Sequence, residues 1–155
     1  MTAAPSILLV EDDEDDYVLA RGLLREIFGP ALKLDWVETW DAGLAALRKG
    51  THDICLADYR LGDRNGLDLV REAATLGCAA PIILLTGQDN REIDLAAVKA
   101  GATDYLVKGQ ITAPLLDRAI RYAIERKKVE QQLVTLAQYD ALTGLANRTP
   151  FRARL

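Results

Sequence analysis

Five short apolar runs, separated by longer segments of helical periodicity, most constrain the fold of this chain. Runs of this length that lie between breaks at Gly and Pro are typical of buried β-strands. Strands and helices that alternate along a chain predict an α/β fold, in which a doubly wound parallel sheet carries helices on both faces. The expected strands are Ile7–Val10, Leu32–Val37, Ile54–Ala57, Ile82–Thr86 and Tyr105–Val107.

Composition narrows the classes of function. The chain has 155 residues, enough for one domain and a short extension, and its formal net charge of -4 argues against a nucleic-acid binder held by bulk charge. No apolar stretch approaches the length of a membrane span, and the first residues lack the pattern of a secretion signal. We therefore expect no nucleic acid, no membrane and a cytoplasmic location, with Cys55 and Cys78 as reduced core residues.

Polar residues follow four of the five apolar runs. Glu11 and Asp12 follow the first run, Asp58 the third and Lys108 the fifth, and Thr86 ends the fourth. Parallel strands place their carboxyl ends on one edge of the sheet, where ligands of such folds bind. Each residue alone has an ordinary explanation, as a turn residue, a helix cap or a solvated lysine. Their occurrence together at strand ends predicts a shared site.

The chemistry of these side chains favours phosphoryl transfer. Carboxylates brought close together repel one another unless a cation lies among them, and oxygen ligands at an open site favour Mg²⁺. A carboxylate can act as a nucleophile, and Asp58, on the central strand, is the natural choice. Lys108 adds positive charge and the Thr86 hydroxyl adds a hydrogen-bond donor.

The acidic run after the first strand divides into parts. Glu11 and Asp12 are expected in the site and Asp13 close to it. Acidic residues in the first turn of a helix face the positive end of the helix dipole. We therefore expect Glu14, Asp15 and Asp16 to start a helix and to be mostly solvated.

These motifs resemble the receiver domain of bacterial two-component response regulators. The residues that carry the resemblance are "ILLVEDD", "ADYRLGDRNG", "LLTG" and "GATDYLVKG", and it covers about residues 5–128. It implies a flavodoxin-like (βα)5 fold with strand order 2-1-3-4-5. It also implies that Asp58 accepts a phosphoryl group from a histidine kinase or phosphotransfer protein, and that the chain itself is not an enzyme.

The resemblance assigns further roles within the site. Asp12, Asp58 and the backbone carbonyl of Arg60 would bind Mg²⁺ directly, and Glu11 would act through water. Thr86 would bond the phosphoryl group, while Tyr105 would turn inward with it. The resemblance also implies a homodimer that responds to phosphorylation. The dimer would form through helix 4, strand 5 and helix 5 of the receiver fold, through the helical stalk described below, or through both. One position departs from the pattern, because Gly109 replaces the proline that usually follows the lysine, which puts the path of this loop in doubt.

The segment after Ala113 predicts one helix longer than the others, extending the last helix of the domain. It has no Gly before Gly144, and Pro114 lies near its start, where a helix tolerates proline. Leu115, Tyr122, Val129 and Leu136 are spaced by sevens, although Glu125 and Gln132 interrupt the seam. We expect a receiver domain over residues 1–128 and a helical stalk over 129–139.

The last residues resemble a second family, the GGDEF domains of diguanylate cyclases. The match is to their opening pattern, D-x-L-T-G-L-x-N-R-x-x-F, over residues 140–155. The family's catalytic loop would lie beyond Leu155, so we expect a truncated output domain that makes no cyclic di-GMP. The matching residues are Asp140, Leu142, Thr143, Gly144, Leu145, Asn147, Arg148 and Phe151.

Two other functions are alternatives to a phosphorylation switch. An aspartate-nucleophile phosphatase typically carries D-x-D after its first strand, whereas this chain has Glu11, Asp12 and Asp13. A phosphate-independent scaffold would keep the pocket and bind partners through the stalk. The sequence disfavours the first and leaves the second open.

Overall fold

Five parallel strands form the central sheet of the computed structural model, which describes residues 4–87, 96 and 99–147, without the side chains of 131 and 134–147. The strand order is β2-β1-β3-β6-β7. Counted along the chain, these five strands have the predicted order 2-1-3-4-5, which confirms the doubly wound fold. Their bounds are β1 Ser6–Val10, β2 Lys33–Val37, β3 Ile54–Asp58, β6 Ile82–Thr86 and β7 Asp104–Val107.

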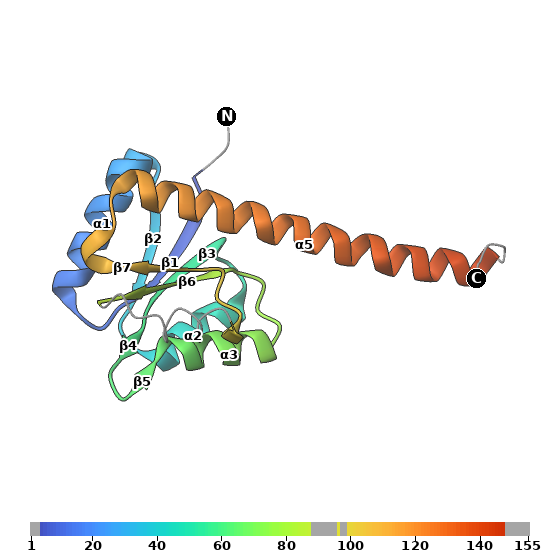
Figure 1. Cartoon of the computed structure of the whole chain (residues 1–155), viewed down its shortest axis with the longest axis horizontal. Helices are drawn as coiled ribbons and strands as arrows, with labels where there is room; N and C mark the ends of the chain where they lie inside the picture. The colour runs from blue at the N-terminus through green and yellow to red at the C-terminus, as the bar shows by residue number, and fades with distance from the viewer. Residues whose placement is uncertain (1–3, 88–95, 97–98, 148–155) are drawn as a thin grey trace. The chain divides into compact units, whose positions relative to one another are not determined.

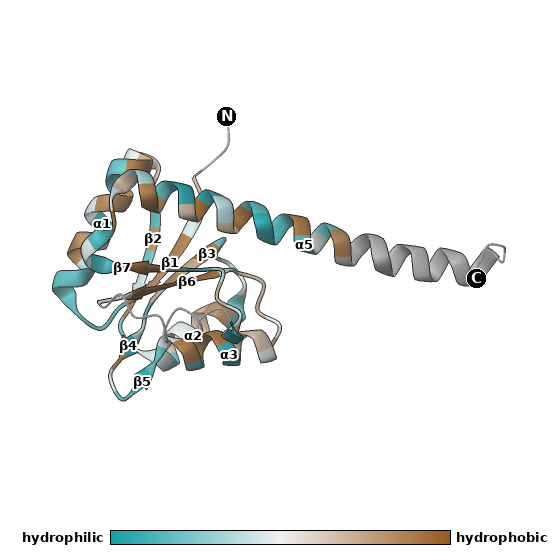
Figure 2. Ribbon diagram, in the orientation of Figure 1, coloured by the Kyte–Doolittle hydropathy of each residue, from teal (hydrophilic) through white to brown (hydrophobic). Residues whose placement is uncertain are grey.

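Helices cover both faces of the sheet (Figure 1). α1 (Glu14–Phe28) and the start of α5 (Ala113–Asn147) pack on one face, and α2 (Trp40–Lys49) and α3 (Gly66–Thr75) on the other. Successive side chains of β1 alternate between the two cores: Leu8 and Val10 face α2 and α3, while Ile7 and Leu9 face α1 and α5. The buried strands are hydrophobic over most of their length (Figure 2).

Three helices begin at a side-chain cap directly after a strand or turn. The carboxylate of Asp13 accepts from the backbone N–H of Asp15 at the start of α1. Thr39 caps α2 and Asn65 caps α3 in the same way. Each cap contributes about 1 kcal/mol to the stability of the folded state and fixes the residue at which the helix begins. The caps therefore help to hold the loops at the carboxyl edge of the sheet in place.

The C-terminal helix α5 continues to Asn147. The chain divides within this helix into two units, Met1–Ile124 and Glu125–Leu155. In the second unit Val129 and Leu133 are exposed. Residues 93–100, between β6 and β7, fall mostly outside the described residues, as do Arg148 and Phe151 of the GGDEF pattern. None of the described helices combines the length and apolar character needed to cross a membrane.

Candidate functional site

The carboxyl ends of four neighbouring strands bring the predicted polar side chains to one edge of the sheet. Glu11, Asp58 and Thr86 are the buried polar residues of the described chain. Lys108 directly follows β7 and opens a short 3-10 turn, Lys108–Gln110. With neighbouring loop residues, the side chains of Asp58, Thr86 and Lys108 line an open hollow of about 610 Å³.

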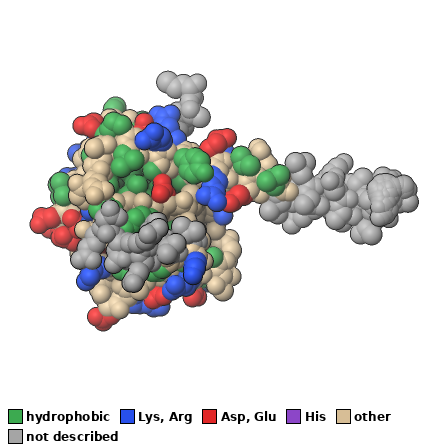
Figure 3. All heavy atoms as spheres, in the orientation of Figure 1, with side chains coloured by type: hydrophobic (Ala, Val, Ile, Leu, Met, Phe, Trp, Pro, Cys, Tyr) green, Lys and Arg blue, Asp and Glu red, His purple; other side chains and the backbone are tan. Residues whose placement is uncertain are grey.

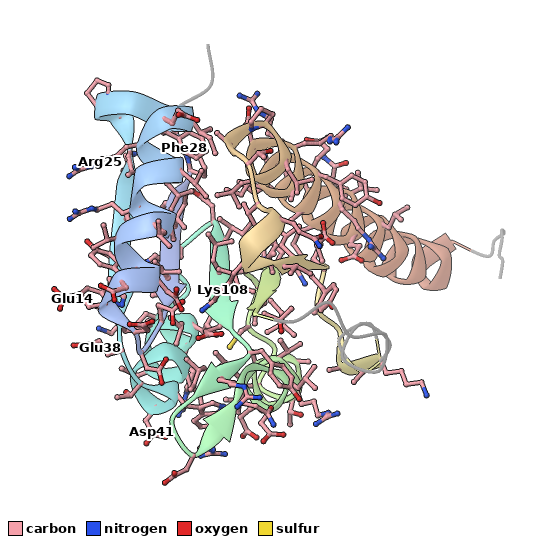
Figure 4. The ribbon with its side chains drawn as sticks, turned by 60° about the vertical axis from the view of Figure 1, so that its left-hand side comes forward. Glu14, Arg25, Phe28, Glu38, Asp41 and Lys108 are labelled. Atoms are coloured by element: carbon pink, nitrogen blue, oxygen red, sulfur yellow. The ribbon has the colours of Figure 1, made fainter. Side chains whose placement is uncertain are left out.

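Lys108 joins three acids through its ammonium group. Its Nζ lies 2.9 Å from Oε1 of Glu11, 2.6 Å from Oδ2 of Asp16 and 3.0 Å from Oδ2 of Asp58. Figure 4 shows Lys108 between the strands and the start of α1. The contacts with Glu11 and Asp16 are hydrogen bonds, and the contact with Asp58 is an ion pair.

Two hydrogen bonds between β2 and the backbone of Glu11 hold this residue in place. Its N–H donates to the carbonyl of Val37 at 3.0 Å, and its own carbonyl accepts from Nε1 of Trp36 at 2.8 Å. The Trp36 ring stacks on Tyr17 of α1, with ring centroids 3.8 Å apart. The residue after β1 is therefore fixed to both the neighbouring strand and the first helix.

Burial and charge shift the titration of two of these groups. Burial, together with the nearby Asp58 carboxyl, raises the pKa of Glu11 to about 8, although Lys108 opposes the shift. Burial alone would lower the pKa of Lys108, but hydrogen bonds with Asp16 and Glu11 and the charge of Asp58 raise it. Lys108 thus stays positively charged, while an ionised Glu11 is costly without a further cation.

Asp16 corrects one prediction made from the sequence. Glu14 and Asp15 are exposed, as expected, and acidic side chains gather at the left edge of Figure 3, where α1 begins. The Asp16 side chain is only 31% exposed and bonds Lys108, so the expectation that it is mostly solvated is wrong. α1 starts at Glu14, which turns Asp16 toward the sheet, on the same side as Ala20 and Leu23.

A small hairpin follows Asp58 that the sequence did not predict. Its strands are β4 (Arg60–Leu61) and β5 (Arg64–Asn65). The backbone N–H of Arg60 donates to Oδ1 of Asp58 at 3.3 Å, and that of Gly62 donates to Oδ2 of Asp12 at 3.1 Å. The guanidinium of Arg64 lies over the Trp40 ring, 3.3 Å from its centroid. The hairpin is thus attached to both the acidic site and α2.

The remaining predicted residues lie on β6, β7 and the loop after it. Thr86 pairs with Val107 and Leu84 with Tyr105, so Thr86 and Tyr105 lie on the same face of the sheet. Tyr105 is half-buried and packs against the core on the side of α2 and α3. Gly109, in place of proline, lies within the 3-10 turn, and the described residues contain no cis peptide bond.

The donor set fits a hard divalent cation. Ligand oxygens of Glu11, Asp16 and Asp58 lie within 4.8 Å of one another, the one such group among the described residues. Asp12, predicted as a direct ligand, is exposed and outside this group, and its carboxylate accepts from the backbone N–H of Gly62. Several carboxylates beside a single ammonium leave negative charge that a cation would offset, and oxygen donors suit Mg²⁺.

Comparison with known proteins gives the same family for most of the chain. A family model described as response regulator receiver domain matches residues 7–121. The photosynthetic apparatus regulatory protein RegA of Rhodovulum sulfidophilum is 38% identical over 117 residues, covering 72% of this chain and 62% of RegA. The transcriptional regulatory protein ZraR of Salmonella typhimurium is 32% identical over 102 residues, covering 66% of this chain and 22% of ZraR.

Solved structures agree with the sequence matches. A receiver domain protein from Clostridium thermocellum has a TM-score of 0.71 and 27% identity, covering 81% of this chain and 98% of that one. The signal receiver domain of a modulated diguanylate cyclase from Desulfovibrio desulfuricans has a TM-score of 0.67 and 28% identity, also covering 81% and 98%. This chain thus spans nearly all of these receiver structures and less than two thirds of the two curated relatives described above.

Proposed function

This chain belongs to the response regulator receiver domain family, and from that membership we propose that Asp58 is its phosphoryl acceptor. The observation that carries the proposal is the three-way contact of Lys108 with Asp58, Glu11 and Asp16 at the carboxyl edge of the sheet. It places a buried carboxylate beside a fixed positive charge, in a hollow open to a phosphorylated partner.

The proposed step is a displacement at phosphorus. A carboxylate oxygen of Asp58 attacks the phosphoryl group of a phosphohistidine on a histidine kinase or phosphotransfer protein. The phosphorus–oxygen bond forms as the phosphorus–nitrogen bond breaks, and the imidazole leaves neutral once its nitrogen takes up a proton. Lys108 stabilises the charge on the phosphoryl oxygens, and Thr86 donates a hydrogen bond to one of them.

Mg²⁺ is the proposed cofactor of this step. Asp12, Asp58 and the backbone carbonyl of Arg60 would hold it, with Glu11 acting through water. Asp12, Asp58 and Arg60 line the same hollow, and Asp12 would turn its carboxylate from the N–H of Gly62 toward Asp58 to take part. When bound, the ion neutralises negative charge among the carboxylates and the phosphoryl oxygens. The high pKa of Glu11 supports this assignment, because an ionised carboxylate in that position is stabilised by a cation.

Acetyl phosphate with Mg²⁺ tests the assignment of Asp58. Wild-type protein is expected to gain one phosphoryl group, which mass spectrometry detects. Asp58→Asn is expected to gain none, whereas the matched control Asp63→Asn, an exposed acid in the adjacent hairpin turn, behaves as wild type. Equal labelling of wild type and Asp58→Asn would refute the acceptor role.

We further propose that phosphorylation acts on a GGDEF output domain that follows α5. Two observations support this: the pattern from Asp140 to Phe151, and the similarity to the receiver domain of a diguanylate cyclase. Dimerisation would carry the signal, with Tyr105 as a switch residue. It would use the face of helix 4, strand 5 and helix 5 in the family's numbering, the stalk, or both; strand 5 and helix 5 of that numbering are β7 and α5 here, and helix 4 would fall between β6 and β7. Receiver domains are not typical enzymes, so the cyclase activity would belong to that output domain alone.

Light scattering tests the proposed dimer. Addition of beryllofluoride and Mg²⁺, which mimic the phosphorylated state, is expected to double the molecular mass of the wild type. Val129 is exposed on the seam, so Val129→Asp is expected to weaken a dimer that uses the stalk. An unchanged mass in wild type after beryllofluoride would argue for the phosphate-independent scaffold instead.

A further inference from the structure

Asp16 contacts Lys108 but takes no part in the proposed phosphoryl transfer. Its carboxylate makes the shortest of the three contacts to Lys108, at 2.6 Å, and it comes from α1 rather than from a strand end. Most of its side chain is shielded from solvent, and so is that of Lys108, which is 20% exposed. A charge-assisted hydrogen bond in such surroundings is stronger than an exposed ion pair.

We propose that Asp16 is a positioning residue that competes with the phosphoryl group for Lys108. The inference rests on the proposed function, since it takes Asp58 as the acceptor. Lys108 donates hydrogen bonds to Glu11 and Asp16 and forms an ion pair with Asp58, so an ammonium that moves toward a phosphoryl group on Asp58 would lengthen its bond to Asp16 on α1. Asp16 therefore restrains Lys108 on the side of α1 and weakens the contact between Lys108 and the phosphoryl group.

The geometry distinguishes Asp16 from its acidic neighbours. Asp15, one residue earlier in the same helical turn, is exposed. Asp13 caps α1, and Asp12 is bonded to the hairpin through Gly62. Of the acids in this run, only Glu11 and Asp16 have a bond to Lys108 in the described structure.

The two neighbouring acids provide a matched pair of variants. Asp16→Asn and Asp15→Asn each remove one negative charge from the first turn of α1. Only the first removes a charged acceptor from Lys108. Binding of beryllofluoride at saturating Mg²⁺, followed by tryptophan fluorescence or NMR, measures how well the site holds a phosphoryl mimic at equilibrium.

Asp16→Asn is expected to tighten beryllofluoride binding about tenfold, the effect of one lost charge-assisted hydrogen bond in competition for Lys108. Asp15→Asn is expected to change it by about twofold or less, because an exposed charge is screened by salt. Unchanged or weaker binding by Asp16→Asn would overturn the inference. Failure of the wild type to bind beryllofluoride at all would overturn the proposed function, and this inference with it.

A double-mutant cycle separates competition for Lys108 from direct repulsion. In a Lys108→Met background, Asp16→Asn is expected to lose its advantage over Asp15→Asn, since there is no ammonium to release. A full tenfold effect in that background would mean that Asp16 acts on the phosphoryl group directly.

NMR of the Lys108 ammonium gives a second measurement without any change to Lys108. Asp16→Asn is expected to shift this resonance before beryllofluoride is added, and Asp15→Asn to leave it in place. An identical resonance in wild type and Asp16→Asn would refute the contact.

Discussion

Replacement of Gly66 by alanine is expected to disturb the end of β3 at Asp58 directly. Gly66 is the first residue of α3, and its N–H donates to the carbonyl of Tyr59 at 2.7 Å. A Cβ atom at this position would lie 2.6 Å from the backbone oxygen of Asp58 and 2.6 Å from Cδ2 of Leu84. Leu84 is fully buried, and the Asp58 oxygen belongs to β3, so neither atom can move away freely.

The expected cost follows from these two contacts. Overpacking of a buried position costs about 1–3 kcal/mol. Alanine gains up to about 1 kcal/mol over glycine within a helix, which offsets part of that cost. A net loss of about 1–2 kcal/mol is expected, which corresponds to a fall in Tm of about 5 °C.

Urea unfolding of metal-free protein, followed by circular dichroism, measures the difference in free energy of unfolding. Gly22→Ala in α1 is the matched control, because a Cβ there meets nothing within 4 Å. That variant is expected to gain about 0.5–1 kcal/mol from helix propensity. A Gly66→Ala protein as stable as the wild type would refute the close approach of α3 to Asp58, and with it the reason for a glycine after Asn65.

Three further changes test individual contacts of the site. In the presence of a chelator, wild type is expected to lose stability as pH rises from about 4.5 to about 8, because the folded state holds the Glu11 proton more tightly than the unfolded state. Glu11→Gln should lack this loss. The urea midpoint of Glu11→Gln relative to that of wild type should therefore rise between about pH 4.5 and about pH 8, and a constant difference would contradict the raised pKa of Glu11. Arg64→Ala is expected to cost about 0.5–1 kcal/mol and to shift Trp40 emission to the red, since the guanidinium covers that ring, and unchanged emission would count against the contact. Trp36→Phe keeps an aromatic ring beside Tyr17 but removes the hydrogen bond to Glu11, so a loss of about 1 kcal/mol in thermal unfolding is expected; no loss would show that this bond contributes nothing.

The sheet and its polar edge were predictable because both depend on chain order and strand period. Runs such as Ile82–Thr86 are buried on both faces and read as continuous apolar sequence. In a parallel sheet the carboxyl ends of the strands lie at one edge. The proximity of Asp58 and Lys108 can therefore be predicted without knowledge of side-chain geometry.

The features that the sequence analysis missed depend on how side chains reach across loops. Asp16 was grouped with its solvated neighbours because all three are acidic. The sequence does carry a signal for Asp16. Leu23 and Ala20 lie on the face of α1 that packs on the sheet, and Asp16, four residues before Ala20, lies on the same face. No comparable signal exists for the hairpin Arg60–Asn65, whose two-residue strands are too short to show any period.

The ionic contacts of Lys108 also have a consequence for how the protein matures. Lys108 lies 97 residues from Glu11 and 92 from Asp16 along the chain. A nascent polypeptide that has not yet released β7 from the ribosome therefore has an acidic pocket without its counter-charge. On the proposed function, the site would become competent for phosphorylation only after β7, the last strand of the sheet, is in place and Lys108 has reached the acids.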